Sequence, residues 1–135
     1  MPEHRQDKQF KRPPRKYQPK GLNILSEDRD IIFVDKVTGL LTMGTDRESI
    51  RTAYSNLTDY VSKGNHKSPH RIFIVHRLDR ETSGVLVFAK TEEVKTYLQS
   101  EWSNFNKTYY AVVHGHLPEN EGIISSYLVE QGVFK

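Results

Sequence analysis

The stretch that most constrains the fold runs from His76 to Lys90 and reads HRLDRETSGVLVFAK. Its first six residues contain two arginines, one histidine and two acids, and the residues from Val85 to Ala89 are all apolar. A short apolar run bounded by polar residues predicts a strand buried in a sheet. The sequence therefore places a dense group of charges at the edge of a buried strand.

Other segments have the apolar patterns that are typical of strands. They are residues 30–36 (DIIFVDK), 40–43 (LLTM), 72–75 (IFIV), 107–115 (KTYYAVVHG) and 122–130 (GIISSYLVE). We expect the segment 40–43 to be the second arm of a turn that begins at Gly39, and a turn around 118–122 to separate the last two strands. The segment 65–70 is predicted to be a loop.

Two helices are predicted between these strands. Thr45 and Glu48 have the spacing of a capping box, and Gly64 is a plausible end of the first helix. The apolar residues of this helix recur at three- and four-residue steps: Ile50, Ala53, Tyr54, Leu57 and Val61. Thr91 is the predicted N-cap of the second helix, with acids in its first turn and an apolar face at Val94, Leu98, Trp102 and Phe105. The fold class is α+β, with a mostly antiparallel or mixed sheet flanked by helices.

Basic character is concentrated at the N-terminus. Residues 1–20 hold seven Lys/Arg and two Asp/Glu, together with four of the six prolines, whereas the other 115 residues hold thirteen Lys/Arg and fifteen Asp/Glu. We therefore predict a basic, flexible tail over residues 1–20 and a domain over residues 21–135. Such a tail can bind nucleic-acid phosphates non-specifically, or it can serve only as a solubilising extension.

Several classes of protein are excluded by composition. No apolar run is long enough to cross a bilayer, and the N-terminus lacks the apolar segment of a secretory signal. The chain has no cysteine, which excludes disulfides, zinc ribbons and thiol nucleophiles. A reducing, cytoplasmic compartment is the simplest expectation.

The charged stretch allows more than one interpretation from its residues alone. Asp79 lies between Arg77 and Arg80, and flanking cations favour an ionised carboxylate that can act as a nucleophile. Thr82 and Ser83 can form hydrogen bonds within a tight turn before Gly84. An ion-pair network that closes the turn is the favoured interpretation at this point. A glycosidase pair of Asp79 with Glu81 is disfavoured, because two such acids must flank a sugar from separate positions.

A resemblance to a known protein family changes which interpretation of the charged stretch is favoured. HRLDRETSG closely resembles the central motif of the RluA-type pseudouridine synthases, in which His-Arg-Leu-Asp is followed by two variable residues and Thr-Ser-Gly. All seven fixed positions are present, from His76 to Gly84. The segment ILSEDRDIIFVDKVTGLLTM is similar to the first strand pair of that family, and KTYYAVVHG is similar to a later strand. The resemblance covers roughly residues 22 to 115.

The resemblance implies an RNA-modifying isomerase that converts uridine to pseudouridine without a cofactor or metal. Asp79 matches the catalytic aspartate, Tyr109 the tyrosine that stacks on the target base, and Arg77 the arginine that helps hold RNA once the uridine is flipped out. His76 and Arg80 are assigned to the same RNA-binding group. Thr82, Ser83 and Gly84 are assigned to support of the turn. The implied partner is ribosomal or transfer RNA.

Three departures from the family pattern accompany the resemblance. The family's Lys-Pro is Lys36-Val37 here, and the sequence does not contain the later Gly-Arg-Thr-His-Gln-Ile-Arg motif. We also expect no S4-type RNA-binding domain before the catalytic part. We therefore expect the front half of a catalytic domain, incomplete at its C-terminal side. The alternative function is that of a non-catalytic RNA-binding fragment. His114 and His116 would face one way on a strand, but no third metal ligand stands near them in sequence.

Overall fold

The computed structural model describes residues 9–44 and 51–131. The chain divides into two compact units, Met1–Phe105 and Asn106–Lys135. All helices and strands found among the described residues belong to the first unit. They are η1 (Arg15–Tyr17), β1 (Leu22–Glu27), β2 (Ile31–Lys36), α1 (Ala53–Ser62), β3 (Phe73–Ile74), β4 (Gly84–Ala89), α2 (Glu92–Ser100) and η2 (Trp102–Asn104).

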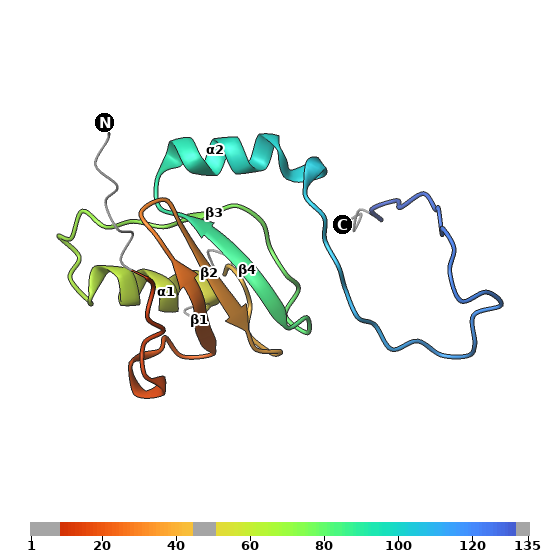
Figure 1. The fold of residues 1–135 in the computed structure, drawn as a ribbon, viewed down its shortest axis with the longest axis horizontal. Helices are drawn as coiled ribbons and strands as arrows, with labels where there is room; N and C mark the ends of the chain where they lie inside the picture. The colour runs from red at the N-terminus through yellow and green to blue at the C-terminus, as the bar shows by residue number, and fades with distance from the viewer. Residues whose placement is uncertain (1–8, 45–50, 132–135) are drawn as a thin grey trace. The chain divides into compact units, whose positions relative to one another are not determined.

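The four strands form one antiparallel sheet in the order β1-β2-β4-β3 (Figure 1). In the central pair, Ile31 lies opposite Ala89 and Lys36 lies opposite Gly84. The turn between β1 and β2 is held by Asp28, whose carboxylate accepts hydrogen bonds from the N–H groups of Asp30 and Ile31. The α+β class and the antiparallel sheet are confirmed, as are the strands predicted at 30–36, 72–75 and 84–90.

Each face of the sheet packs against one helix, because side chains alternate along a strand (Figure 1). Ile32 and Val34 of β2 and Leu86 and Phe88 of β4 form a fully buried core with Ala53 and Leu57 of α1. Val87 and Ala89 face the other way, and the apolar residues of α2, Val94 and Leu98, pack against them. This two-sided burial fixes the positions of β2 and of β4, the strand that follows the charged stretch.

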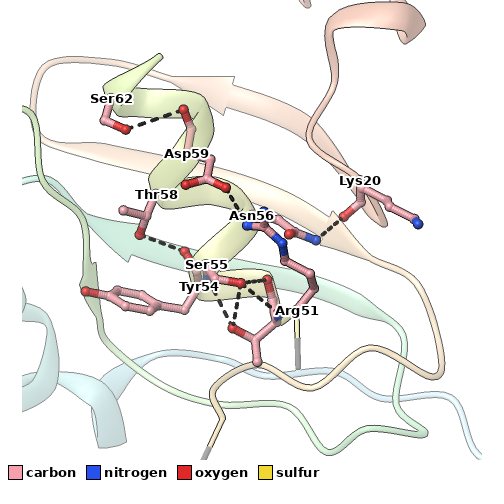
Figure 2. A network of polar contacts seen from close by, with 9 residues as sticks. Lys20, Arg51, Tyr54, Ser55, Asn56, Thr58, Asp59 and Ser62 are labelled. Carbon is pink, nitrogen blue, oxygen red and sulfur yellow. Dashed lines mark hydrogen bonds and ion pairs between the residues drawn. The ribbon is translucent and has the colours of Figure 1, made fainter. Parts of the chain in front are cut away.

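Polar contacts fix the start of α1, as Figure 2 shows. Thr52 is the N-cap and forms a reciprocal capping box with Ser55. The Asn56 amide donates to the carbonyl oxygen of Lys20 over 2.9 Å, which ties the helix to the segment before β1. The capping box predicted at Thr45 and Glu48 lies outside the described residues, but the helix begins only at Ala53. It ends at Ser62, just before the predicted stop at Gly64.

The prediction of a strand at residues 40–43 is wrong, because these residues form no strand. The partners of β2 are β1 and β4 instead. The carbonyl oxygens of Leu41 and Thr42 accept hydrogen bonds from the N–H groups of Ala53 and Tyr54, at the start of α1. Since these carbonyls satisfy the free donors of the helix, they are not available to a sheet.

The strands predicted at 107–115 and 122–130 are also absent from the structure. Tyr110, Val112 and Ile123 are almost fully exposed, and so are Tyr127 and Leu128. A strand exists only through pairing, and no described segment pairs with these residues. His114 and His116 therefore do not lie on a strand, contrary to the prediction.

Part of the predicted tail contacts the rest of the first unit. Phe10 packs partly against the core, and the Gln18 side chain bridges Pro13 O and the Ile24 N–H over 2.7 and 2.8 Å. The boundary predicted at residue 20 stays a prediction, as does the flexibility of residues 1–20. Among the described helices, none is long and apolar enough to span a membrane.

Candidate active site

Asp79 lies on the connection between β3 and β4. The N–H of Thr82 donates to the carbonyl oxygen of Asp79 over 3.1 Å, which closes a tight turn, and Asp79, Arg80 and Glu81 are exposed. Among the described residues no ion pair joins the charged side chains of this turn; the ion pairs found there lie elsewhere. The ion-pair network favoured from composition is therefore not what holds the turn.

A buried lysine holds it instead. Lys36, the last residue of β2, is fully buried, and its ammonium donates to Leu40 O at 2.7 Å, Val37 O at 3.0 Å and Arg80 O at 3.3 Å. Burial lowers the pKa of Lys36, while the nearby carboxylates of Glu81 and Asp79 act in the opposite direction. The ammonium thus joins the loop after β2 to the turn that carries Asp79.

Three neighbours of Lys36 complete this attachment. The Gly39 N–H donates to Arg80 O and the Thr38 hydroxyl donates to Glu81 O, both over 2.7 Å. The Thr42 hydroxyl donates to Leu78 O at 2.7 Å and accepts from the Leu78 N–H at 3.1 Å. We call Lys36, Thr38, Gly39 and Thr42 the backbone clamp. It fixes the main chain on both sides of Asp79 and leaves the carboxylate exposed.

The backbone clamp was missed from the sequence, although one signal was present. Ile32, Val34 and Lys36 alternate along β2 and therefore share its buried face. A lysine on a buried face must find acceptors, since an unpaired buried charge is costly. This pattern would have identified Lys36, whereas nothing local marks Thr38 or Thr42.

His76 is packed rather than exposed. Its ring stacks on Trp102 with centroids 4.3 Å apart, and its Nε2 accepts a hydrogen bond from the Val87 N–H over 3.2 Å. Nε2 therefore acts as an acceptor in this contact. Trp102 packs in the α2 side of the core, as predicted, but Phe105 contacts only its edge and is 38% exposed. His76 therefore anchors the start of the charged stretch to the sheet.

The remaining predicted site residues lie in different places. Arg77 and Arg80 are exposed beside Asp79. The side chains of Thr82 and Ser83 form no hydrogen bond with the rest of the described chain, so only main-chain and backbone-clamp contacts hold the turn. Tyr109 belongs to the second unit and is 63% exposed. The site that the first unit assembles is thus the stretch from His76 to Gly84 with the backbone clamp beneath it.

The model of one protein family, described as RNA pseudouridylate synthase, matches residues 30–134. The chain belongs to this family. An RNA pseudouridine synthase of Mycoplasma pneumoniae is 35% identical over 127 residues, which are 91% of this chain and 39% of that protein. The dual-specificity RNA pseudouridine synthase RluA of Vibrio cholerae is 33% identical over 77% of this chain and 40% of its own length. The predicted RluA-type family is therefore confirmed.

Two further matches were found. The tRNA pseudouridine synthase C of Vibrio parahaemolyticus is 34% identical over 78% of this chain and 42% of its own. A solved human structure, RNA pseudouridylate synthase domain containing 4, is 23% identical with a TM-score of 0.49 over 60% of this chain and 29% of that one. The chain spans about two fifths of the length of the curated relatives that it matches.

Gly84, the last fixed position of the family motif, begins β4 at a φ of +130°. Side chains other than glycine rarely adopt this conformation. We expect Gly84→Ala to lower the free energy of unfolding by about 1–3 kcal/mol, through backbone strain alone, because no atom crowds the new Cβ. Urea unfolding measures this, with Gly122→Ala as the control at a glycine whose φ is not positive. If Gly84→Ala and Gly122→Ala lower the free energy of unfolding equally, the positive φ of Gly84 is not the cause of the loss.

The buried ammonium of Lys36 predicts a pH dependence of stability. Since burial lowers its pKa, the folded chain releases this proton at a lower pH than the unfolded chain does. The unfolded chain then binds more protons between the two pKa values, so stability rises with pH in that interval. We expect the free energy of unfolding of the unaltered chain to rise relative to Lys36→Met as the pH approaches 10.5, the ordinary lysine value, from below. Urea unfolding at several pH values tests this, and a constant or shrinking difference contradicts it.

Proposed function

We propose that this chain carries the catalytic carboxylate of an isomerase that converts uridine to pseudouridine in RNA, and that this carboxylate is Asp79. One observation carries the proposal. Asp79 is exposed on a turn whose main chain is fixed on both sides by the backbone clamp, within a complete family motif. A charged group that reacts with a bound nucleotide must be accessible, yet held in one place.

The chemistry that this arrangement supports is an internal transfer. The bond between the ribose and the uracil ring nitrogen breaks, the uracil turns, and a bond forms between the ribose and a ring carbon. That ring carbon loses its proton and the nitrogen gains one, so the atoms balance without a cofactor. An ionised carboxylate can stabilise positive charge on the sugar or add to it. Asp79 is proposed to act in one of these two ways.

The target uridine has to leave its helix to reach Asp79. Extrusion costs roughly a few kcal/mol, and stacking on an aromatic ring returns about 1–3 kcal/mol. Tyr109 is proposed as the stacking residue. Arg77 and Arg80, both exposed beside Asp79, are proposed to bind the displaced RNA backbone. His76 is proposed to contribute by positioning, because its ring is packed against Trp102.

Two general features of the chain and its relatives support RNA as the binding partner. The relatives described above are named RNA or tRNA pseudouridine synthases, and residues 1–20 carry a strong basic excess. We also propose that the substrate is ribosomal or transfer RNA and that the protein acts in the cytoplasm. Among the described residues no cluster of His, Asp and Glu could hold a metal ion, and a metal-independent reaction stays part of the proposal.

RNA binding without turnover is the second candidate function. It is favoured by the second unit, in which Tyr109 is largely exposed and the described residues 106–131 form no strand. In that case the arginines and the basic tail would hold RNA, but no base would be positioned for reaction.

Nucleoside analysis separates the two candidates. Bulk RNA is incubated with the purified chain and digested to nucleosides, and pseudouridine is then separated from uridine by chromatography. We expect new pseudouridine with the unaltered chain and none with Asp79→Asn, while both proteins retain the RNA in a filter-binding assay. Retention of RNA without any pseudouridine from either protein would favour the second candidate.

A further inference from the structure

A hollow of about 730 Å³ lies at the end of the sheet away from Asp79. It is bounded by η1, the end of β1, the β1–β2 turn, the C-terminal end of α1, the loop before β3 and the residue after β4. In the β2–β4 pair the register runs from Ile31 and Ala89 at this end to Lys36 and Gly84 at the other (Figure 1). At about 3.3 Å per residue, the length of β4 separates the two ends by roughly 17 Å.

The lining of this hollow is basic. Four of its side chains are Arg29, Lys63, Arg71 and Lys90, and the acid among them, Glu27, is already paired with Lys90 at 2.6 Å. Arg71 donates to the carbonyl oxygens of Ser68 and His70, which orients its guanidinium without neutralising it. Arg29 is 91% exposed and pairs with Asp30 over 3.2 Å, and Asp30 does not line the hollow. The hollow therefore keeps a positive excess.

Two tyrosines lie among these cations. Tyr17 of η1 is 60% exposed, and the Lys16 ammonium lies 4.8 Å from the centre of its ring. Tyr60 of α1 is half-buried; burial and the charge of Glu27 raise its pKa, so its hydroxyl stays a hydrogen-bond donor. The chain on either side of Tyr17 adds exposed cations: Lys11, Arg12, Arg15 and Lys20. A cationic surface with accessible aromatic rings fits a strand of unpaired nucleotides, whose phosphates and base faces it can bind together.

We propose that this hollow, which we call the basic hollow, binds a single-stranded segment of the RNA substrate that flanks the target uridine. That the ligand is RNA rests on the proposed function. That the hollow has a basic and aromatic lining is an observation independent of that function. The segment would contact Lys63 and Arg29 through its phosphates and Tyr17 through a base. The substrate would then be held at two separate places, at Asp79 and at the opposite end of the sheet.

The test measures binding by the full 135-residue chain. The hollow variant combines Arg29→Gln with Lys63→Asn, since asparagine tolerates the left-handed backbone at position 63 (φ 52°). The control variant combines Lys67→Gln with Lys95→Gln, which removes the same charge from outside the hollow. Affinities are measured over a range of salt concentrations for a long uridine-containing single strand and for uridine monophosphate. Circular dichroism confirms that the variants remain folded.

We expect the salt dependence for the long strand to become shallower by about 1.4 in the hollow variant, because each lost phosphate contact removes about 0.7 from the slope. The control variant should change much less. Tyr17→Ala should weaken binding of the long strand by about tenfold through loss of stacking. Uridine monophosphate should bind the hollow variant and the control variant alike.

Equal losses in the hollow and control variants would overturn the inference, and so would an unaltered chain that does not bind the long strand. If uridine monophosphate and the long strand lose affinity equally, the hollow binds a single phosphate group rather than an RNA strand. These readouts do not depend on turnover. If the unaltered chain makes no pseudouridine but the hollow variant still loses affinity for the long strand, the proposed function is contradicted. The inference about the basic hollow is then still supported.

Discussion

Asp79→Asn is expected to lower the rate of uridine isomerisation at least about a thousandfold while changing RNA affinity by less than about twofold. Asparagine has nearly the same size as aspartate but lacks the charge that the sugar requires. The contacts that hold the turn use main-chain atoms, notably the carbonyl oxygens of Asp79 and Arg80, and these remain in the variant. Single-turnover rates with excess protein isolate the chemical step from product release.

Glu81→Gln is the matched control for this loss. Glu81 is exposed in the same turn, two residues from Asp79, and its hydrogen bond with the backbone clamp uses only the main-chain carbonyl. Its replacement removes the same charge and should leave the rate within about threefold, the size of a minor electrostatic change. A comparable loss in both variants would show that the turn needs negative charge in general, and would contradict the specific role of Asp79.

The second large effect concerns stability. Lys36→Ala should lower the free energy of unfolding by about 3–5 kcal/mol, because three carbonyl oxygens lose their shared donor and a buried volume empties. The free energy of unfolding of a domain is typically only about 5–15 kcal/mol, so we expect part of the Lys36→Ala protein to unfold at moderate temperature. Urea unfolding monitored by circular dichroism gives the value.

Two variants define what the Lys36 result means. Lys36→Met keeps the volume and removes the donors, so it should lose less stability than Lys36→Ala and still reduce the isomerisation rate by loosening the Asp79 turn. Lys67→Ala, at an exposed lysine, should change stability by no more than about 0.5 kcal/mol. If Lys36→Ala unfolds at the same urea concentration as Lys67→Ala, the backbone clamp does not stabilise the fold.

Much of the first unit could be predicted because its signals are local. The apolar runs of β2 and β4 are continuous and bounded by charge, which is sufficient to identify buried strands. Thr91 caps α2 as predicted, since its hydroxyl accepts from the Val94 N–H over 3.2 Å. The position of Asp79 between two strands followed from the same pattern.

Other features depend on contacts between distant residues. The segment 40–43 is as apolar as a short strand, but its carbonyl oxygens bind the start of α1 and the Lys36 ammonium instead. The hydroxyl of Thr42 contacts Leu78, 36 residues away in sequence. No periodicity in the sequence encodes such a pair. The helix before β3 was predicted, but the Thr52 and Ser55 capping box at the start of α1 was overlooked.

The strands predicted after residue 106 failed for a different reason. Their sequences contain β-branched and aromatic residues, but strand propensity mainly reflects packing against neighbouring strands. None of the described segments supplies such a neighbour, and the apolar side chains are exposed. Among the proposed site residues, Tyr109 therefore has the least structural support for its role, and that role has to be tested by experiment.

The most direct measurement is the release of tritium from RNA labelled at the uracil ring carbon that becomes the new glycosidic carbon. Isomerisation replaces the proton on that carbon, so the unaltered chain should release tritium in step with pseudouridine formation, and Asp79→Asn should release none. If a folded chain that binds RNA releases no tritium, or if Asp79→Asn releases as much as the unaltered chain, the proposed role of Asp79 in this polypeptide is contradicted.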